Sequence, residues 1–302
     1  MREVSPRSPV AILLILFVLA YAILLVGAPI AAIVDGTFSG ETRPTRGGTR
    51  TPVAEVDPNQ SEFERRVNPV WEALDNPQVL HALQLTFMLA AGATLLNTVF
   101  GMMIAWVLER QRFIGRRMLD LLVDIPFVFS PVIAGYTLIV LFGRGGWIDS
   151  PVAIVFALPG MLLAKTFVCL PFVPREVGPV LSNLTQEPEE AAYTLGASRW
   201  GTFWRIVLPN IWIGLIYGIV LTLARGLGEF GAVAVVSGGI EGKTETATMF
   251  VFRALSDRNR IGAYSVSLAL GAIAVLILVV MSFLHHRLNV NRERSSHVYS
   301  VE

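Results

Sequence analysis

The chain has 302 residues, of which 53% are hydrophobic and 16% are charged, whereas soluble globular domains usually carry about 25% charged residues. This composition excludes an ordinary soluble domain and predicts an integral membrane protein. The formal net charge of +1 leaves no polycationic surface for nucleic acid. A single cysteine, Cys169, excludes an internal disulfide or a thiolate metal site, and the four histidines lack a metal-binding spacing, so neither a metal nor a cofactor is expected.

Six apolar segments are long enough to span a membrane, since about 20 helical residues cross a hydrocarbon core of about 30 Å. They cover residues 10–34, 79–108, 119–142, 151–173, 210–236 and 263–284. The first is longer than the apolar part of a signal peptide and is expected to remain as a span. The predicted fold class is therefore all-α, a polytopic membrane protein with six transmembrane helices.

The segments around these spans complete the predicted organisation. Residues 1–34 form an N-terminal segment with the first helix, residues 35–78 an external loop, residues 79–286 the transmembrane core, and residues 287–302 a tail. Near the end of the external loop, Val70, Trp71 and Leu74 suit a short surface helix. Arginines are dense at 109–118, which favours a cytoplasmic position for that segment. With six spans, both termini are then cytoplasmic.

Prolines interrupt the third and fourth predicted spans. Each removes a helical hydrogen bond and tends to kink the helix, and they occur at positions 126, 131, 159 and 171. Both spans are therefore expected to be bent.

The polar segment 174–209 is predicted to form a cytoplasmic helix-turn-helix. Acidic residues from Glu187 onward favour the positive end of a first helix, and Gly196 can end that helix in the left-handed conformation. A second short helix from about residue 198 to residue 207 is expected to stop before Pro209. The residues by themselves suit an amphipathic connector on the membrane surface as well as a docking element.

This segment carries a spaced pattern that consists of Glu190, Ala191, Ala192, Gly196, Ile206, Leu208 and Pro209. The pattern resembles, at each of these positions, the EAA loop of permease subunits of ABC importers, which docks into a groove on the ATPase subunit. The resemblance implies that these seven residues couple the permease to ATP hydrolysis. Small alanine side chains allow a partner to approach closely, and the glycine permits the turn.

Two further stretches narrow the resemblance. They read DIPFVFSPVIAG at residues 124–135 and ARGLGEFGAV at residues 224–233, and the second is followed by VSGG and GKTET. They resemble the sulfate/thiosulfate permease subunit of type I importers, although GEFG also occurs in molybdate/tungstate permeases. The implied function is import of a tetrahedral oxyanion, with sulfate or thiosulfate favoured and molybdate or tungstate as the alternative. Lys165 departs from this resemblance, because an uncharged residue is expected there.

The resemblance also implies partners in the cell inner membrane. The sequence has no G-x-x-x-x-G-K-[ST] phosphate loop, so this chain is expected to be a non-catalytic transport subunit, with ATP hydrolysed by separate ATPase subunits, two copies by the resemblance. A second homologous permease subunit and an external sulfate-binding protein would complete the importer. Membrane lipid surrounds it, and no nucleic acid is involved.

Charged residues within the spans are candidates for the substrate pathway. Arg225 and Glu229 lie four residues apart, and so on one face of a predicted helix. A charge at membrane depth costs a few kcal/mol unless it is paired or hydrated. Arg225 either frames the anion route or forms a structural ion pair with Glu229, and the ion pair is favoured because Glu229 offsets the charge that a sulfate needs. Ser130 and Ser237 are further candidates for contact with the anion.

Asp120 and Asp124, close to Arg116 and Arg117, are expected to supply negative charge at a helix N-terminus and to form ion pairs at the membrane interface, and not to relay protons. Lys165 is expected either to snorkel or to pair with a carboxylate such as Glu229. An ion-coupled secondary transporter, with Asp124 or Glu229 as its coupling carboxylate, is a second hypothesis, but it leaves the helix-turn-helix unexplained. An intramembrane protease is disfavoured, because the spans hold no paired aspartates and no Ser/His arrangement.

Overall fold

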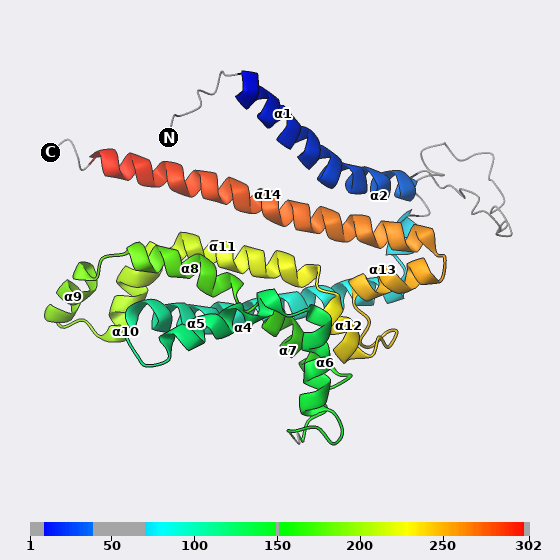
Figure 1. Ribbon diagram of the computed structural model, residues 1–302, viewed down its shortest axis with the longest axis horizontal. Helices are drawn as coiled ribbons and strands as arrows, with labels where there is room; N and C mark the ends of the chain where they lie inside the picture. Colours follow the sequence, from blue (N-terminus) through cyan, green and yellow to red (C-terminus); the bar gives the residue numbers. More distant parts are fainter. Residues whose placement is uncertain (1–8, 39–69, 149–150, 299–302) are drawn as a thin grey trace. The chain divides into compact units, whose positions relative to one another are not determined.

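The computed structural model describes residues 9–38, 70–148 and 151–298, and all regular structure within them is helical (Figure 1). This confirms the all-α prediction. The chain divides into two compact units, one made of Met1–Val79 with Val251–Ala269, the other of Leu80–Phe250 with Leu270–Glu302. The second unit holds every residue of the predicted helix-turn-helix and of the predicted ion pair.

The first unit begins with a continuous helical run made of α1 (Pro9–Ala22), the π-helix η1 (Ile23–Gly27) and α2 (Ala28–Phe38), which covers the first predicted span. Most of the predicted external loop, at residues 39–69, lies outside the described residues. Residues 70–74 are helical, as predicted. The long helix α4 (Pro77–Arg110) then begins after Asn76, whose side-chain oxygen accepts a hydrogen bond from the Gln78 amide at 2.9 Å.

Within the described residues, four helical runs are long and apolar enough to cross a membrane, and a bent pair makes a fifth if it counts as one span. The four runs are Ile15–Phe38, Pro77–Arg110, Arg199–Leu227 and Arg260–Phe283. The bent pair is α5 (Arg116–Val128) with α6 (Pro131–Phe142), which meet at 112°. The predicted bend in the third span is therefore confirmed, whereas the count of six spans stays a prediction.

The fourth predicted span, at 151–173, differs from the structure. Its helical part is only α7 (Leu158–Cys169), and after a break at Leu170 and Pro171 the chain continues as α8 (Phe172–Asn183). Proline has no amide hydrogen and so cannot continue the hydrogen-bond ladder of α7. The result is two short helices in place of one long one, and α8 extends well into the segment that was predicted to be polar surface structure.

The fifth predicted span, at 210–236, is likewise not one helix. It divides into α11 (Leu208–Leu227) and α12 (Gly231–Ser237), because Glu229 leaves the helical path and its carboxylate accepts a hydrogen bond from the Ala232 amide at 3.0 Å. This hydrogen bond satisfies an amide in the first turn of α12, which has no partner within the helix. After α12 the chain forms α13 (Ala247–Ser256) and α14 (Arg260–Val298), and α14 continues beyond the predicted sixth span into the predicted tail.

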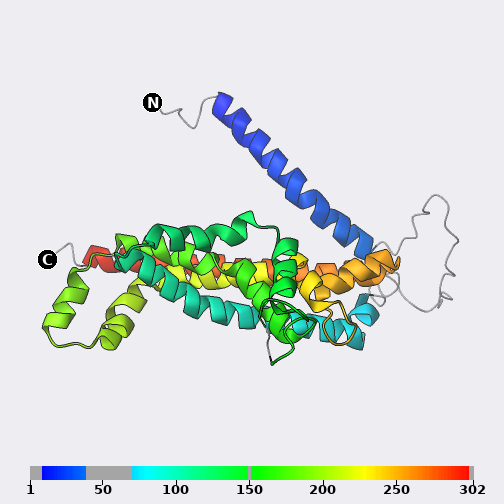
Figure 2. The same ribbon diagram turned by 60° about the horizontal axis from the view of Figure 1, so that its bottom comes forward.

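Two buried clusters form the core of the second unit. One joins α4, α7, α12 and α13, and its members are Leu85, Leu89, Met161, Ala164, Val168, Ala232, Val233, Val236 and Met249. The other joins α4 and α8 to the start of α11, and its members are Met102, Ala105, Val173, Val177, Leu181, Val207, Ile211 and Leu215. Helices α8 and α11 lie side by side in both views (Figure 1, Figure 2).

Glycine makes the close contact of α8 with α11 possible. A Cβ atom added at Gly218 of α11 would lie 2.9 Å from the Cα atom of Val173 in α8, a distance at which one of the two helices must move. Small residues commonly allow membrane helices to approach in this way.

We therefore expect Gly218→Ala to destabilise the protein by about 1–3 kcal/mol, because the added methyl group overpacks this contact. The matched control is Gly271→Ala in α14, where an added Cβ atom meets no heavy atom within 4 Å and alanine favours the helix. Thermal unfolding of the purified protein in detergent measures both. Equal unfolding temperatures for the two variants would show that the α8–α11 contact tolerates a side chain.

Candidate functional site

The predicted helix-turn-helix is present in the second unit, and we call residues 187–209 the hairpin. Its first helix is α9 (Glu187–Thr194), and Gly196 follows it with φ +85°. An added Cβ atom at Gly196 would meet no heavy atom within 4 Å, so the requirement for glycine there is conformational and not steric. The second leg begins with α10 (Arg199–Thr202), which is capped by the Ser198 hydroxyl, an acceptor for the Gly201 amide at 3.1 Å.

The prediction that the second leg stops before Pro209 is wrong. Helix α10 continues through the π-helix η2 (Phe203–Val207) directly into α11. Pro209 lies in the first turn of α11, where proline is tolerated, and the wider π-helical turn before it accommodates the missing amide hydrogen. The hairpin is therefore joined to α11 without a flexible link.

A buried ion pair holds the first leg of the hairpin. Glu189 is buried, and its Oε1 atom accepts a hydrogen bond from Nη2 of Arg110 at 2.8 Å. Both terminal nitrogens of Arg110 also donate to the backbone carbonyl of Leu184, each at 3.2 Å. The sequence analysis did not identify this pair. The one sequence feature that pointed to this pair is the run of adjacent glutamates in α9. Of these, Glu189 is buried and Glu190 is exposed.

An aromatic contact and a buried apolar cluster hold the second leg. Phe203 packs edge to face on Trp106 of α4, with ring centroids 6.0 Å apart. Val207 is fully buried in the cluster that joins α4, α8 and α11. Trp200 and Trp204 continue the aromatic group outward from Phe203.

The outer surface of the hairpin is unusually apolar. Leu195 at its turn is 88% exposed and Trp200 is 70% exposed, with Tyr193 and Trp204 also exposed. Of the seven residues of the EAA-like pattern, Glu190, Ala191, Gly196 and Pro209 are exposed, and Ala192, Ile206 and Leu208 are partly buried. Large exposed apolar patches mark protein or membrane interaction sites. The hairpin is thus a firmly anchored element with a surface suited to contact.

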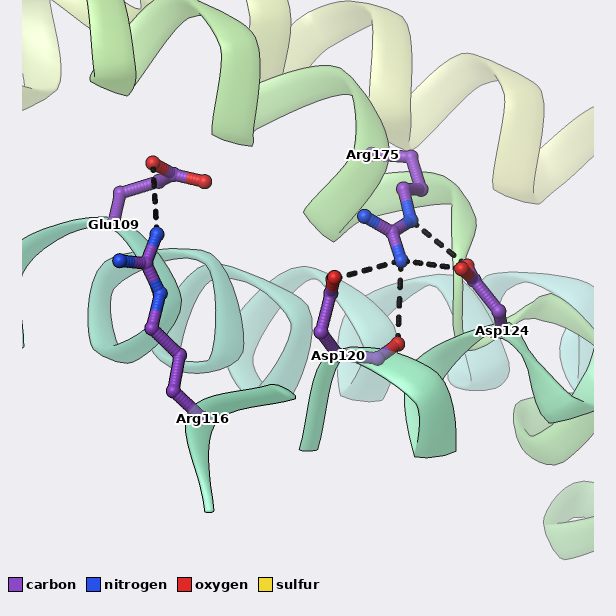
Figure 3. A network of polar contacts seen from close by, with 5 residues as sticks. All are labelled: Glu109, Arg116, Asp120, Asp124 and Arg175. Carbon is purple, nitrogen blue, oxygen red and sulfur yellow. Dashed lines mark hydrogen bonds and ion pairs between the residues drawn. The ribbon is translucent and has the colours of Figure 1, made fainter. Parts of the chain in front are cut away.

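A second polar network links α5 to α8 (Figure 3). Arg175 donates to both carboxylate oxygens of Asp124, at 2.8 and 2.6 Å, and its Nη2 atom lies 2.9 Å from the carboxylate of Asp120. The predicted ion pairing of these aspartates is therefore present, but their partner is Arg175 of α8 and not the neighbouring Arg116. Four residues apart on α5, they share the helix face next to Arg175 of α8, whereas the side chain of Arg116 extends toward Glu109, at 3.7 Å (Figure 3).

The electrostatic surroundings of Arg175 favour its charged form. Partial burial acts to lower the pKa of its guanidinium, but the hydrogen bonds and negative charges of Asp124 and Asp120 outweigh burial and raise that pKa above its ordinary value. The guanidinium of Arg175 therefore stays charged, and its contacts with Asp120 and Asp124 fasten the helix that precedes the hairpin to the bent α5–α6 pair.

The predicted Arg225–Glu229 ion pair is present, with Nη1 of Arg225 2.5 Å from the Glu229 carboxylate. Arg225 belongs to α11, whereas Glu229 lies in the break before α12. Lys165 of α7 is fully buried, so the expectation that it snorkels to the interface is wrong. Among the residues that the structure describes, no three His, Cys, Asp or Glu side chains gather as a metal site.

The two serine candidates make local contacts. The buried Ser237 hydroxyl donates to the sulfur of Met249 at 3.4 Å and accepts from the Gly239 amide at 3.2 Å. Ser130 is exposed and precedes α6, where its carbonyl accepts from the Ala134 amide at 3.1 Å. The hydrogen bonds of the two serines therefore support helix ends and loops. Of the four predicted substrate-pathway residues, the structure brings Arg225 and Glu229 into contact with each other.

We expect Arg110→Met to release the first leg of the hairpin, because it leaves the buried carboxylate of Glu189 without its partner at a cost of about 3–5 kcal/mol. Faster proteolytic cleavage within residues 184–198 measures the release. Arg112→Met, at an exposed position two residues away, is the control. Cleavage at the same rate in both variants would show that the ion pair does not anchor the hairpin.

Comparison with known proteins places this architecture in a family. Residues 97–294 match the family model of the binding-protein-dependent transport system inner membrane component. The chain is 47% identical over 230 residues to the sulfate transport system permease protein CysW of Synechocystis sp. (strain ATCC 27184 / PCC 6803 / Kazusa), an alignment that covers 74% of this chain and 83% of the relative. It is 39% identical over 222 residues to the sulfate transport system permease protein CysT of Escherichia coli (strain K12), covering 72% and 80%.

A solved structure shares the fold. It is the crystal structure of a bacterial ABC transporter involved in the import of the acidic polysaccharide alginate, which superposes with a TM-score of 0.66 at 17% identity and covers 92% of this chain and 94% of that chain. Together with the family match over residues 97–294, these likenesses decide the assignment. The chain belongs to the family of binding-protein-dependent transport system inner membrane components.

Proposed function

We propose that this chain is a permease subunit of an ATP-driven importer of sulfate or thiosulfate. The observation that carries the proposal is the anchored hairpin, which presents the EAA-like pattern and an exposed apolar surface at the joint between α8 and α11. The substrate follows from the relatives, which are named as sulfate transport permeases. Those names favour sulfate over the molybdate or tungstate alternative.

The proposed mechanism is mechanical. A separate ATPase subunit binds the hairpin and moves it when ATP binds and is hydrolysed. The second leg passes this motion directly to α11, because η2 leaves no flexible link between them. The first leg follows α8, and Arg175 passes the motion of α8 to α5 through Asp120 and Asp124. Alternating access to the substrate pathway then results from movement of these helices.

The proposed assembly contains two ATPase subunits, a second related permease and an external binding protein. The likeness of this chain to both CysW and CysT supports a pair of related, non-identical permeases. In this assembly the hairpin, the arginine-rich segment 109–118 and both termini lie on the cytoplasmic side of the inner membrane, since ATP is cytoplasmic.

The secondary-transporter hypothesis has less support. A proton-coupling carboxylate must change its protonation state during transport. Asp124 is held by Arg175, and Glu229 is held by Arg225 and by the Ala232 amide. Both carboxylates are therefore engaged in ion pairs that a proton-coupling role would have to break.

We expect Glu190→Lys to abolish sulfate uptake and to weaken co-purification of the ATPase subunit, because the reversed charge lies on the proposed docking surface. Glu187→Lys is the matched control, because it makes the same charge change at an exposed position of α9 outside the EAA-like pattern. Uptake of radiolabelled sulfate by cells that express the whole importer measures the effect, and membrane insertion is checked separately. If both variants transport at the unmodified rate, the docking role of this surface is refuted.

The turn of the hairpin allows an independent test. Gly196→Val forces a left-handed backbone onto a β-branched residue at a cost of about 1–3 kcal/mol, and we expect it to abolish uptake by distorting the docking surface. Gly145→Val is the control, because Gly145 has φ +75° and equally open surroundings but lies outside the hairpin. Equal loss of uptake in both variants would indicate a general effect of backbone strain instead of a role for the hairpin.

A further inference from the structure

Lys165 is the largest fully buried side chain in the part of the chain that the structure describes. Its Nζ atom is buried and forms no hydrogen bond with any described residue. Lysine is almost never fully buried unless it is paired, and burial of an unpaired ammonium group is costly. The residue therefore needs a reason to be retained in the apolar cluster that contains its neighbours Met161, Ala164 and Val168.

The position of Lys165 supplies that reason. Its side chain passes next to α11 at Gly226, where an added Cβ atom would lie 3.8 Å from Cδ of Lys165. Gly226 directly follows Arg225. The ammonium group interacts electrostatically with three neighbours: Cys169 and the carboxylate of Glu229, which favour its charge, and the guanidinium of Arg225, which repels it. Lys165, Arg225 and Glu229 thus form one charged group, which we call the core triad.

The core triad has an uncompensated positive charge. It contains two cations and one carboxylate, and the carboxylate of Glu229 is already engaged by Nη1 of Arg225 and by the Ala232 amide. Without Lys165 the remaining pair would be neutral. The carboxylate of Glu229 by itself would cancel the charge of Arg225. Because Lys165 offsets Glu229, a net positive charge remains next to Arg225 and can attract an anion.

Exposure distinguishes the members of the core triad. The side chain of Arg225 is 35% exposed, whereas that of Glu229 is 1% exposed and Lys165 is fully buried. An anion can therefore reach Arg225 alone. A guanidinium has five N–H donors in a planar fork that matches an oxyanion, and the ion pair with Glu229 engages Nη1, which leaves donors on the other nitrogens for a ligand.

We propose that Arg225 contacts the permeating divalent oxyanion, and that Lys165 is a positioning residue that offsets the charge of Glu229 so that the core triad stays positive. This inference rests on the proposed function, because it assigns a transit site for the substrate of that importer. It assigns a role to Lys165, the residue at which this chain departs from the expected uncharged position.

The test restores the charge balance by a second substitution. Lys165→Met keeps an unbranched side chain one atom shorter than lysine but makes the core triad neutral, and we expect sulfate uptake per ATP hydrolysed to fall about tenfold. Adding Glu229→Gln returns the net charge to its original value, and Gln keeps a side-chain oxygen for the Ala232 amide. We expect the double variant to recover uptake to within about threefold of the unmodified importer.

The assay uses the complete importer in vesicles, with its ATPase subunits, partner permease and binding protein, and radiolabelled sulfate. Unchanged uptake in Lys165→Met overturns the proposal, and so does a double variant that stays as low as the single one. If Lys165→Met does not assemble, Arg225→Gln decides, because unchanged uptake by the assembled Arg225→Gln importer also overturns it. Absence of sulfate uptake by the unmodified importer refutes the proposed function instead.

Discussion

The close contact between α8 and α11 is the constraint on which the rest of the second unit depends. These helices enter and leave the hairpin, so the distance between them sets the distance between its two legs. A side chain at Gly218 would hold them apart, and the buried cluster of Val173, Val177, Val207 and Ile211 fills the space between them with apolar atoms. Because the contact is apolar and tightly packed, we expect a displacement of the hairpin to move both helices and not to be absorbed by rotation of side chains.

Ion pairs then determine which helices respond together. Arg110 attaches the first leg of the hairpin to α4, and Arg175 attaches α8 to α5. The two pairs differ in burial. The Arg110–Glu189 pair is nearly inaccessible to water and is costly to break, whereas the network around Arg175 is partly exposed. The ion pair beside the hairpin is therefore shielded from water, whereas the contact between α5 and α8 is open to it.

The core triad lies where the substrate is proposed to pass, and it too depends on the compensation of buried charges. A charge at membrane depth is retained when something compensates it. Glu229 compensates Arg225 and also accepts a hydrogen bond from the Ala232 amide in the first turn of α12, so one carboxylate supports the start of a helix and positions a guanidinium. The buried Lys165 is compensated only in part, and a second negative charge would complete the balance. In a transporter of anions, the substrate itself can supply that charge.

Local sequence signals determined much of this protein. Composition gave the membrane class and the all-α fold, and the spacing from Glu190 to Pro209 predicted the hairpin with its turn at Gly196, because capping, proline and glycine effects act within a few residues. Only the tertiary structure decided that Asp124 pairs with Arg175, that Glu189 is the buried glutamate of α9 and that Lys165 lies fully inside the core. It also decided that Glu229 lies in the break between α11 and α12 while keeping Arg225 as its partner. These outcomes depend on which helix faces are in contact. Packing between residues far apart in the chain determines those contacts, whereas the periodicity of a single segment does not.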